Sequence, residues 1–261
     1  AGSLTLNDGV VLKVINGITN LLTADKFIVN DGANIVQTNT TANVGLATVK
    51  KKSTPMVLND ATLWSSPVAN QNLRNFSPST LLKRFYEYNE TTNGFAGLFV
   101  YDANYPPIDD LYDPLTYNFI PGKGYHIRVS NNQTTNEPGT IFEGNFVGIL
   151  NNGNYSVPIT KNGRGYNLVG NPYPSNIDGR LILLNNPSIS SLHYWTHEAS
   201  LGSSGYRHNN YASYNIVGGV QAVAGGQTPN QFIQKGQGFL VQAIANTTIN
   251  FYNTLRVEHN N

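Results

Sequence analysis

Oxygen-bearing side chains gather in one proline-rich stretch of this 261-residue chain, residues 102–114. Those that offer carboxylate or amide oxygens are Asp102, Asn104, Asp109, Asp110 and Asp113. Calcium prefers such hard oxygen ligands, although their spacing here is not that of an EF-hand. The stretch predicts either a calcium site or a solvated loop whose aspartates cap turns, and the pattern favours the loop. Calcium is the one candidate cofactor, and no other is predicted.

Aromatic and amide side chains gather in a second stretch, residues 199–219. Its candidate ligand-binding residues are Tyr206, Arg207, His208, Tyr211 and Tyr214. Sugar rings stack on flat aromatic faces and bond to neighbouring donors, and tyrosine is equally enriched at protein interfaces. We interpret the stretch as a long loop with its three tyrosines exposed, lining the main ligand or partner surface. Trp195 and Tyr88 are instead expected to be core residues.

No residue pattern reaches the specificity of a catalytic signature. His193 and His197 would lie about 13 Å apart along a strand, too far to bind one metal ion together. Residues 202–205 (GSSG) lack the spacing of a serine nucleophile elbow. Acids are sparse, and those that could supply a carboxylate pair for glycoside cleavage are Glu87, Glu143 and Glu198. The sequence therefore assigns no catalytic residue.

Three short motifs occur twice, in the same order. The first copy has residues 63–67 (LWSSP), 85–89 (FYEYN) and 122–127 (GKGYHI), and the second has residues 168–172 (LVGNP), 192–196 (LHYWT) and 236–241 (GQGFLV). The offsets of 105, 107 and 114 residues are what loop insertions would produce between two descendants of one unit. We predict two pseudo-repeated modules, residues 53–152 and 153–261, with the asparagine-rich residues 151–154 at their boundary.

The repeated motifs have the composition of strands and strand ends. β-branched and aromatic runs are punctuated by glycine, proline and asparagine at short intervals, which predicts an all-β fold built of β-sandwich modules. In each GxG-aromatic motif, two glycines would permit a close backbone approach before the aromatic residue anchors the strand in the core. The prolines after the first motif would stop the sheet from propagating. Both motifs are therefore interpreted as structural.

The N-terminal residues 1–52 carry a shorter repeat. Residues 4–9 (LTLNDG) recur 23 positions later as residues 27–32 (FIVNDG), and an apolar run follows each copy. An Asn-Asp-Gly corner suits a tight turn, so each copy predicts strand, turn and strand. Repetition at this period resembles stacked rungs of a β-solenoid, and two tandem hairpins remain the alternative.

Composition restricts the partners. Charged residues make up 12% of the chain, against about 25% in an average domain, and the formal net charge is +1. Neither nucleic acid nor an anionic membrane surface would be attracted electrostatically, and no apolar run is long enough for membrane insertion. Cysteine is absent, and glycine, asparagine and tyrosine are abundant, which is typical of extracellular β proteins. We expect an extracellular or cell-surface location, with the chain a mature product or an excised fragment.

Several of these segments resemble modules of large secreted or cell-surface proteins of Bacteroidota, many of them adhesin-like cargo of the type IX secretion system. The segments are residues 27–50, 64–68 (WSSPV), 165–175 (GYNLVGNPYPS) and 236–239 (GQGF). The resemblance implies a non-catalytic extracellular surface or adhesion module within a larger secreted protein. The alternatives are a glycan-binding module of a polysaccharide-processing protein and a polysaccharide-active enzyme. The expected partner is a glycan or a host or neighbouring surface protein.

Overall fold

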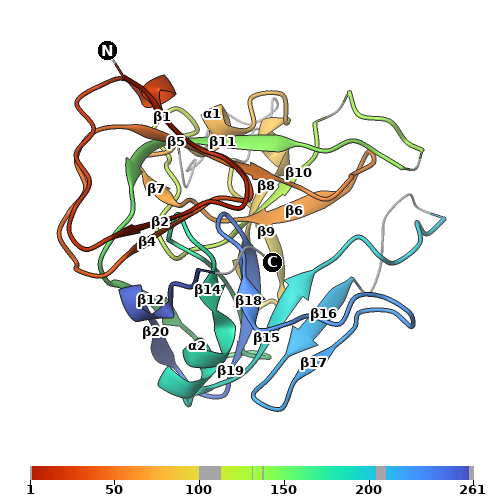
Figure 1. The fold of residues 1–261 in the computed structure, drawn as a ribbon. Coiled ribbons are helices and arrows are strands. Elements are labelled where there is room, and N and C mark those ends of the chain that lie inside the picture. The colour runs from red at the N-terminus through yellow and green to blue at the C-terminus, as the bar shows by residue number, and fades with distance from the viewer. Residues whose placement is uncertain (1, 100–112, 131, 137, 204–209, 259–261) are drawn as a thin grey trace.

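Strands dominate the computed structural model of the chain (Figure 1), as the all-β prediction requires. The structure describes residues 2–99, 113–130, 132–136, 138–203 and 210–258. Within these ranges lie twenty short strands, two short α-helices and three single turns of 3-10 helix. No helix of the described part is long and apolar enough to cross a membrane.

The N-terminal strands stack in parallel at the spacing of the 23-residue repeat. They are β1 (Leu4–Leu6), β2 (Val11–Val14), β3 (Phe27–Val29), β4 (Asn34–Gln37) and β5 (Ala47–Lys52), with the turn η1 (Ala24–Lys26) before β3. β1 pairs with β3 from Leu4 opposite Phe27, and β2 pairs with β4 from Val11 opposite Asn34. β3 continues the ladder by pairing in parallel with β5.

The next part of the chain forms an antiparallel sheet of four strands in the order β6-β10-β8-β9. The elements of this part of the chain, in order, are β6 (Ala61–Trp64), β7 (Val68–Ala69), α1 (Leu73–Phe76), η2 (Leu82–Arg84), β8 (Phe85–Asn89), β9 (Gly94–Gly97), β10 (Tyr125–Arg128) and β11 (Glu143–Leu150). β11 pairs in antiparallel fashion with both β5 and β7. β5 therefore joins the N-terminal ladder to this part of the fold.

The remaining residues form a second antiparallel sheet in the order β13-β19-β15-β16-β17. The elements of this last part of the chain, in order, are β12 (Tyr155–Ile159), β13 (Tyr166–Gly170), β14 (Ile177–Asp178), α2 (Gly179–Asn185), β15 (Ile189–Trp195), β16 (Tyr211–Tyr214), β17 (Gly219–Val220), β18 (Phe232–Ile233), β19 (Gly238–Ala243), β20 (Thr247–Phe251) and η3 (Asn253–Leu255). β12 pairs with β20, and β14 pairs with β18. Residues 151–154 lie between β11 and β12.

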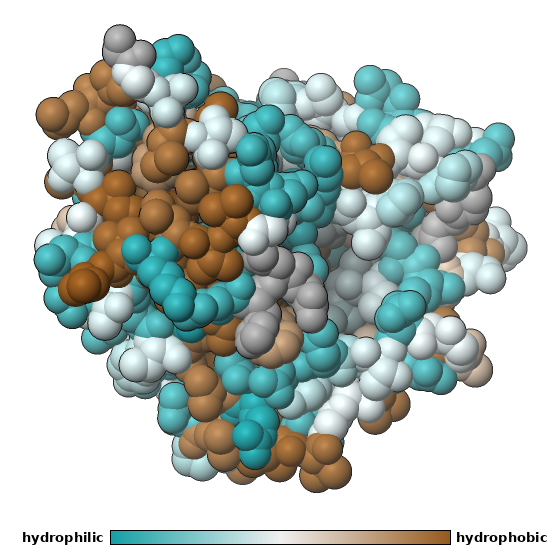
Figure 2. Space-filling model, viewed as in Figure 1, coloured by the Kyte–Doolittle hydropathy of each residue, from teal (hydrophilic) through white to brown (hydrophobic). Residues whose placement is uncertain are grey.

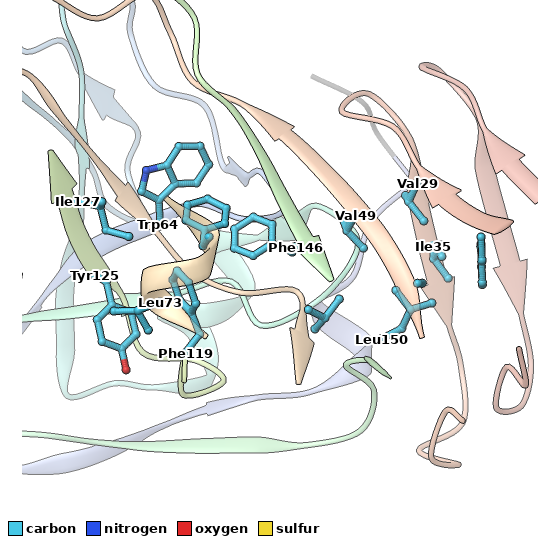
Figure 3. Close-up of a cluster of buried hydrophobic side chains, with 14 of the residues drawn as sticks. Val29, Ile35, Val49, Trp64, Leu73, Phe119, Tyr125, Ile127, Phe146 and Leu150 are labelled. Carbon is cyan, nitrogen blue, oxygen red and sulfur yellow. The ribbon is translucent and has the colours of Figure 1, made fainter. Parts of the chain in front are cut away.

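Strand alternation sorts the apolar side chains into three clusters. The first runs without a break from the N-terminal strands into the first sheet, so that Val29 and Val49 lie in line with Phe146 and Trp64 (Figure 3). The second fills the space under the second sheet around residues such as Phe239. The third is small and lies where the two sheets meet. Its buried members are Leu63, Leu168 and Leu240, and the partly buried side chains against them are Tyr88, Phe95, Tyr166, Trp195 and Tyr211.

Backbone contacts join the two sheets at matching positions. Ser65 N donates to Gly236 O at 2.9 Å, and Gly170 N donates to Gly122 O at 2.9 Å. The isolated bridges between Trp64 and Gln237 and between Lys123 and Val169 are likewise antiparallel in both places. In each contact, the residue after a strand end of one sheet, or at its end, donates to the first glycine of the GxG motif that precedes a strand of the other sheet. The contact therefore occurs twice, once in each direction between the two sheets.

The glycines of the repeated GxG motifs make these contacts possible. Gly122 and Gly236 have φ values of +80° and +74°, a conformation that side chains disfavour. A Cβ atom at Gly124 would lie only 2.4 Å from the carbonyl oxygen of Val169. The aromatic residues that follow, Tyr125 and Phe239, are fully buried. The close approach and the aromatic anchor are thus those that the motif predicts.

Candidate functional site

A cleft of about 430 Å³ opens between the two sheets and is lined by residues of β6, β15 and β16. The surface is visibly hollowed between the two halves of the molecule in Figure 2. The lining of the cleft comes from residues 51–54, 62–64, 194–198, 227–230, 232, 234 and 236–238, with Ala212. The site therefore combines segments that lie far apart in the sequence.

His197 holds the inner wall of the cleft to the opposite sheet. Its Nδ1 forms a short hydrogen bond with the Thr54 hydroxyl, and its Nε2 lies 2.9 Å from the carbonyl oxygen of Ala61. The indole Nε1 of Trp195 also lies 3.2 Å from that Nε2. According to the tautomer of the ring, Nε2 either donates to the Ala61 carbonyl or accepts from the Trp195 indole, so His197 lies against both the first sheet and Trp195 at the cleft.

Glu198 is the one carboxylate among the described residues that line the cleft. Its Oε1 accepts a hydrogen bond from Gln227 N at 2.7 Å, which ties the strand end to the opposite rim. Its Oε2 is buried and has no hydrogen-bond partner in the described part of the chain. A buried acceptor without a donor is costly, but this oxygen has almost no accessible surface, so a ligand would reach it only if the neighbouring residues moved.

The other polar groups of the cleft are amides, hydroxyls and two lysines. Lys51 is already neutralised, because its Nζ lies 2.9 Å from the Asp31 carboxylate and also donates to Gln234 Oε1 at 2.6 Å. Lys52 is exposed at the rim. The uncharged polar side chains that line the cleft are Ser53, Thr54, Thr62, Thr196, Gln227, Thr228, Asn230, Gln234 and Gln237.

Trp195 and Phe232 contribute partly exposed aromatic surface to the cleft. Trp195 also meets the Tyr211 ring edge-on with centroids 5.0 Å apart. Trp195 and Tyr88 both pack against the small cluster between the sheets, but they are only partly buried, whereas the sequence predicted core residues. Trp195 therefore packs against this cluster and also lines the solvent-accessible cleft.

The glutamates considered for glycoside cleavage are committed to separate partners. Glu87 forms an ion pair with Lys123 at 2.6 Å, and Glu143 forms one with Lys50 at 3.3 Å. Neither lines the cleft that contains Glu198. The structure does not bring these acids together there as the pair that the chemistry requires.

The histidines show no metal-binding arrangement either. His193 lies on β15 with its Nε2 2.9 Å from the Ser191 hydroxyl, and burial lowers the pKa of its ring. Across the described ranges, no three His, Asp or Glu side chains come close enough together to hold a metal ion.

Part of the tyrosine-rich stretch is strand, where the sequence predicted a long loop. Tyr211 and Tyr214 lie on strand β16, which pairs with β15 and β17. Tyr214 is only 7% exposed and packs into the second core, so its predicted exposure is wrong. Tyr211 is partly buried between the sheets, and burial raises the pKa of its phenol. The two rings are three residues apart and so point to opposite faces of the strand.

Other predicted site residues fall outside the described part of the chain. These are Tyr206, Arg207 and His208 of the candidate ligand site and Asp102, Asn104, Asp109 and Asp110 of the candidate calcium site. Asp113 is described, and its carboxylate accepts from Leu115 N at 2.9 Å and from the Thr116 hydroxyl at 3.2 Å. Asp113 therefore caps a turn, and the calcium site stays a prediction.

The cleft itself was not predicted from the sequence. Its rim residues Gln227, Thr228 and Asn230 lie in a polar connection without a repeated motif. The available signal was the second GxG motif, because Gln237 lies between its glycines and lines the cleft. That motif indicates a close backbone approach, although it does not reveal which segment approaches.

Comparison with known families and structures gives one match. A family model described as Domain of unknown function (DUF8693) matches residues 1–261, so the chain belongs to that family. No curated protein and no solved structure matches the chain.

Proposed function

We propose that this member of the family is a non-catalytic extracellular binding module of a larger secreted protein, and that its cleft recognises a carbohydrate. The observation that carries the proposal is the cleft lining: one partly exposed indole amid hydroxyl and amide groups. Sugar rings present apolar faces and a dense set of hydroxyls, so an aromatic surface beside neutral donors and acceptors complements them.

Binding without cleavage is favoured over an enzyme. Hydrolysis of a glycosidic bond generally uses two carboxyl groups about 5 to 10 Å apart across the bond. Among the described residues of the cleft only Glu198 is acidic, and its Oε1 already accepts the Gln227 amide. The described lining has the groups for orientation and contact and contains no second acid for the chemistry.

A duplicated architecture is part of the proposal. The first sheet has the order β6-β10-β8-β9, and the second repeats it as β13-β19-β15-β16. The flanking pairs β5 with β11 and β12 with β20 also correspond. We infer two descendants of one β-sandwich unit, close to residues 53–152 and 153–261, which face each other across the third cluster. The cleft lies at their junction.

The N-terminal strands supply the third part of the architecture. Parallel pairing at offsets of 23 residues (β1 with β3, β2 with β4) and 20 residues (β3 with β5) is the geometry of successive solenoid rungs. Tandem hairpins would instead pair each strand with its neighbour in antiparallel fashion. We infer a short solenoid-like segment stacked on the first module through β5.

The surface or adhesion role rests on the sequence. Low charge, the absence of cysteine and the resemblance to type IX secretion cargo of Bacteroidota support an extracellular or cell-surface location. A protein partner on a host or neighbouring surface is the second candidate for the same cleft, because aromatic and amide side chains also serve protein contacts.

A glycan array with two matched variants tests the proposal. Thr228→Arg places a long cation on the exposed cleft rim, and Thr248→Arg makes the same change on the exposed side of β20. We expect the unmodified protein to bind a subset of the glycans on the array. The Thr228→Arg variant should no longer bind them, and the Thr248→Arg variant should bind them as the unmodified protein does. Equal retention by both variants would remove the cleft from the binding site. Turnover of a retained polysaccharide would instead establish an enzyme.

A further inference from the structure

The N-terminal ladder of strands ends at an open edge. β1 has β3 as its only partner in the described chain, and β2 has only β4. Both terminal strands belong to the first turn of the winding, so their free edges face the same end of the N-terminal segment. Free strand edges present unpaired N–H and C=O groups, and proteins usually cover or charge them.

Leu6 of this first turn is buried like its counterpart Val29, but other apolar side chains of the turn are exposed where those of the next turn are buried. Leu4 is 45% exposed and its counterpart Phe27 is 5% exposed. Val10 is 42% exposed and its counterpart Ala33 is fully buried. The difference arises because the first turn covers the second, while no described residue covers the first.

An apolar groove of about 320 Å³ marks this open end. Its lining includes Leu4, Leu12, Ile18 and Leu22, and more exposed leucine and isoleucine side chains surround it. Figure 2 shows the resulting hydrophobic patch over the N-terminal segment of Figure 1. Terminal repeats of a solenoid normally carry a polar outer face, which this one lacks.

Hydrogen bonds between asparagine side chains of successive turns all run in the same direction, toward the open end. Asn30 Nδ2 donates to Asn7 Oδ1 at 3.4 Å, and Asn39 Nδ2 donates to Asn16 Oδ1 at 2.9 Å. Each bond runs from the later turn to the equivalent residue 23 positions earlier. In the described structure, the exposed Asn7 and Asn16 have no acceptor for their own Nδ2 groups, which would donate to an earlier turn in the same way.

We propose that this open end is the docking surface for a further solenoid rung, carried before β1 by a longer form of this polypeptide. The rung would consist of two short apolar strands parallel to β1 and β2, joined by an Asn-Asp-Gly-like corner. It would continue the interface that β1 and β2 already make with β3 and β4. Its asparagines would accept from Asn7 and Asn16, and its apolar side chains would cover Leu4 and Leu12.

A second copy of the chain fits this surface less well. A two-fold axis would pair β1 with its own copy in antiparallel fashion. The free Nδ2 donors of Asn7 and Asn16 in the two copies would then face each other. The donor-to-acceptor arrangement that joins Asn30 to Asn7 would not continue across the interface. A parallel rung preserves both the pairing and this arrangement.

Adding a rung tests the proposal. A copy of residues 4–26 is fused directly before Leu4, in place of residues 1–3, at the spacing of the existing turns. The matched control carries Leu6→Ser, Leu12→Ser and Ile18→Ser in the added copy only. Hydrogen exchange of the amides in β1 and β2 and the fluorescence of a dye that binds apolar surface are then measured.

We expect the added rung to slow exchange in β1 and β2 by at least about tenfold and to reduce dye binding, whereas the control does neither. Equal exchange in the two fusions would overturn the proposal. Sedimentation of the unmodified chain gives an independent check, with Leu4→Lys and, on α2, the similarly exposed Leu184→Lys as control. A concentration-dependent dimer that only Leu4→Lys dissociates would assign the surface to a second copy and also overturn it.

Discussion

Replacing Glu90 by glutamine should loosen the contact between the two antiparallel sheets. Glu90 follows β8 of the first sheet, and its carboxylate enters the loop between β12 and β13, which leads into the second sheet. Oε1 accepts from Gly163 N and Gly165 N, both at 2.7 Å. Oε2 accepts from Asn162 N at 2.8 Å and from a threonine hydroxyl. One buried side chain therefore satisfies three backbone donors of the partner loop.

The magnitude follows from the geometry. A glutamine side chain keeps one acceptor oxygen and turns a donor toward the remaining two hydrogen bonds. Hydrogen bonds to a charged group contribute about 1.5–3 kcal/mol each, and relaxation of the loop recovers part of that. We expect Glu90→Gln to lower the free energy of unfolding by about 2–4 kcal/mol at pH 7. Glu143→Gln is the control, because its ion pair with Lys50 is largely exposed and contributes about 1 kcal/mol or less.

The loss of stability in Glu90→Gln should depend on pH in a characteristic way. Burial alone would raise the pKa of Glu90, but the donors from Asn162, Gly165 and Gly163 outweigh it and hold the pKa below the ordinary 4.5. A depressed pKa contributes stability above the unfolded-state value, and that contribution is lost as the pH falls through the folded-state value. Urea unfolding should therefore show a constant difference between wild type and Glu90→Gln from pH 7 to about 5, and a shrinking one below about 4.5. A difference below about 0.5 kcal/mol at pH 7, or one that grows on acidification, would refute this reasoning.

Three further predictions concern the junctions of the fold. Gly124→Ala should destabilise the protein in thermal unfolding, because its Cβ would meet a backbone oxygen at 2.4 Å, whereas Gly97→Ala meets nothing within 4 Å and should be nearly neutral. Lys235→Met should cost about 3 kcal/mol or more in urea unfolding, since the fully buried Nζ donates to three backbone carbonyls of the corner 30–33. His126→Phe should flatten the loss of stability from pH 6.5 to 3, because burial lowers the pKa of His126 to about 3 and the unfolded chain binds the proton first. An unchanged slope would mean that His126 is not held neutral in the folded protein.

The sequence predicted the parts of the fold that recur. The Asn-Asp-Gly spacing anticipated the offset at which Leu4 lies opposite Phe27, and the GxG motif anticipated both the close approach at Gly124 and the buried Tyr125. These features depend on local conformation and on neighbours of fixed spacing. Short motifs report such properties directly.

The candidate site was less predictable because it depends on how distant segments pack. Nothing in the run around Trp195 and Glu198 indicates that residues 227–238 lie opposite. The exposure of Tyr214 was misjudged because its stretch was interpreted as a loop. Once Tyr211 and Tyr214 are placed on a strand, their odd spacing requires opposite faces, and one of those faces is the second core.

Carbohydrate binding in the cleft is tested most directly by a hydrogen-exchange footprint. The unmodified protein is compared free and saturated with a glycan retained on the array, with Thr228→Arg measured in parallel. We predict slower exchange in residues 194–198 and 227–238, which include lining residues of the cleft, with no change in the Thr228→Arg variant and no cleavage of the glycan. Protection confined to other segments, or the same protection in Thr228→Arg, would contradict the assignment of the cleft as the binding site.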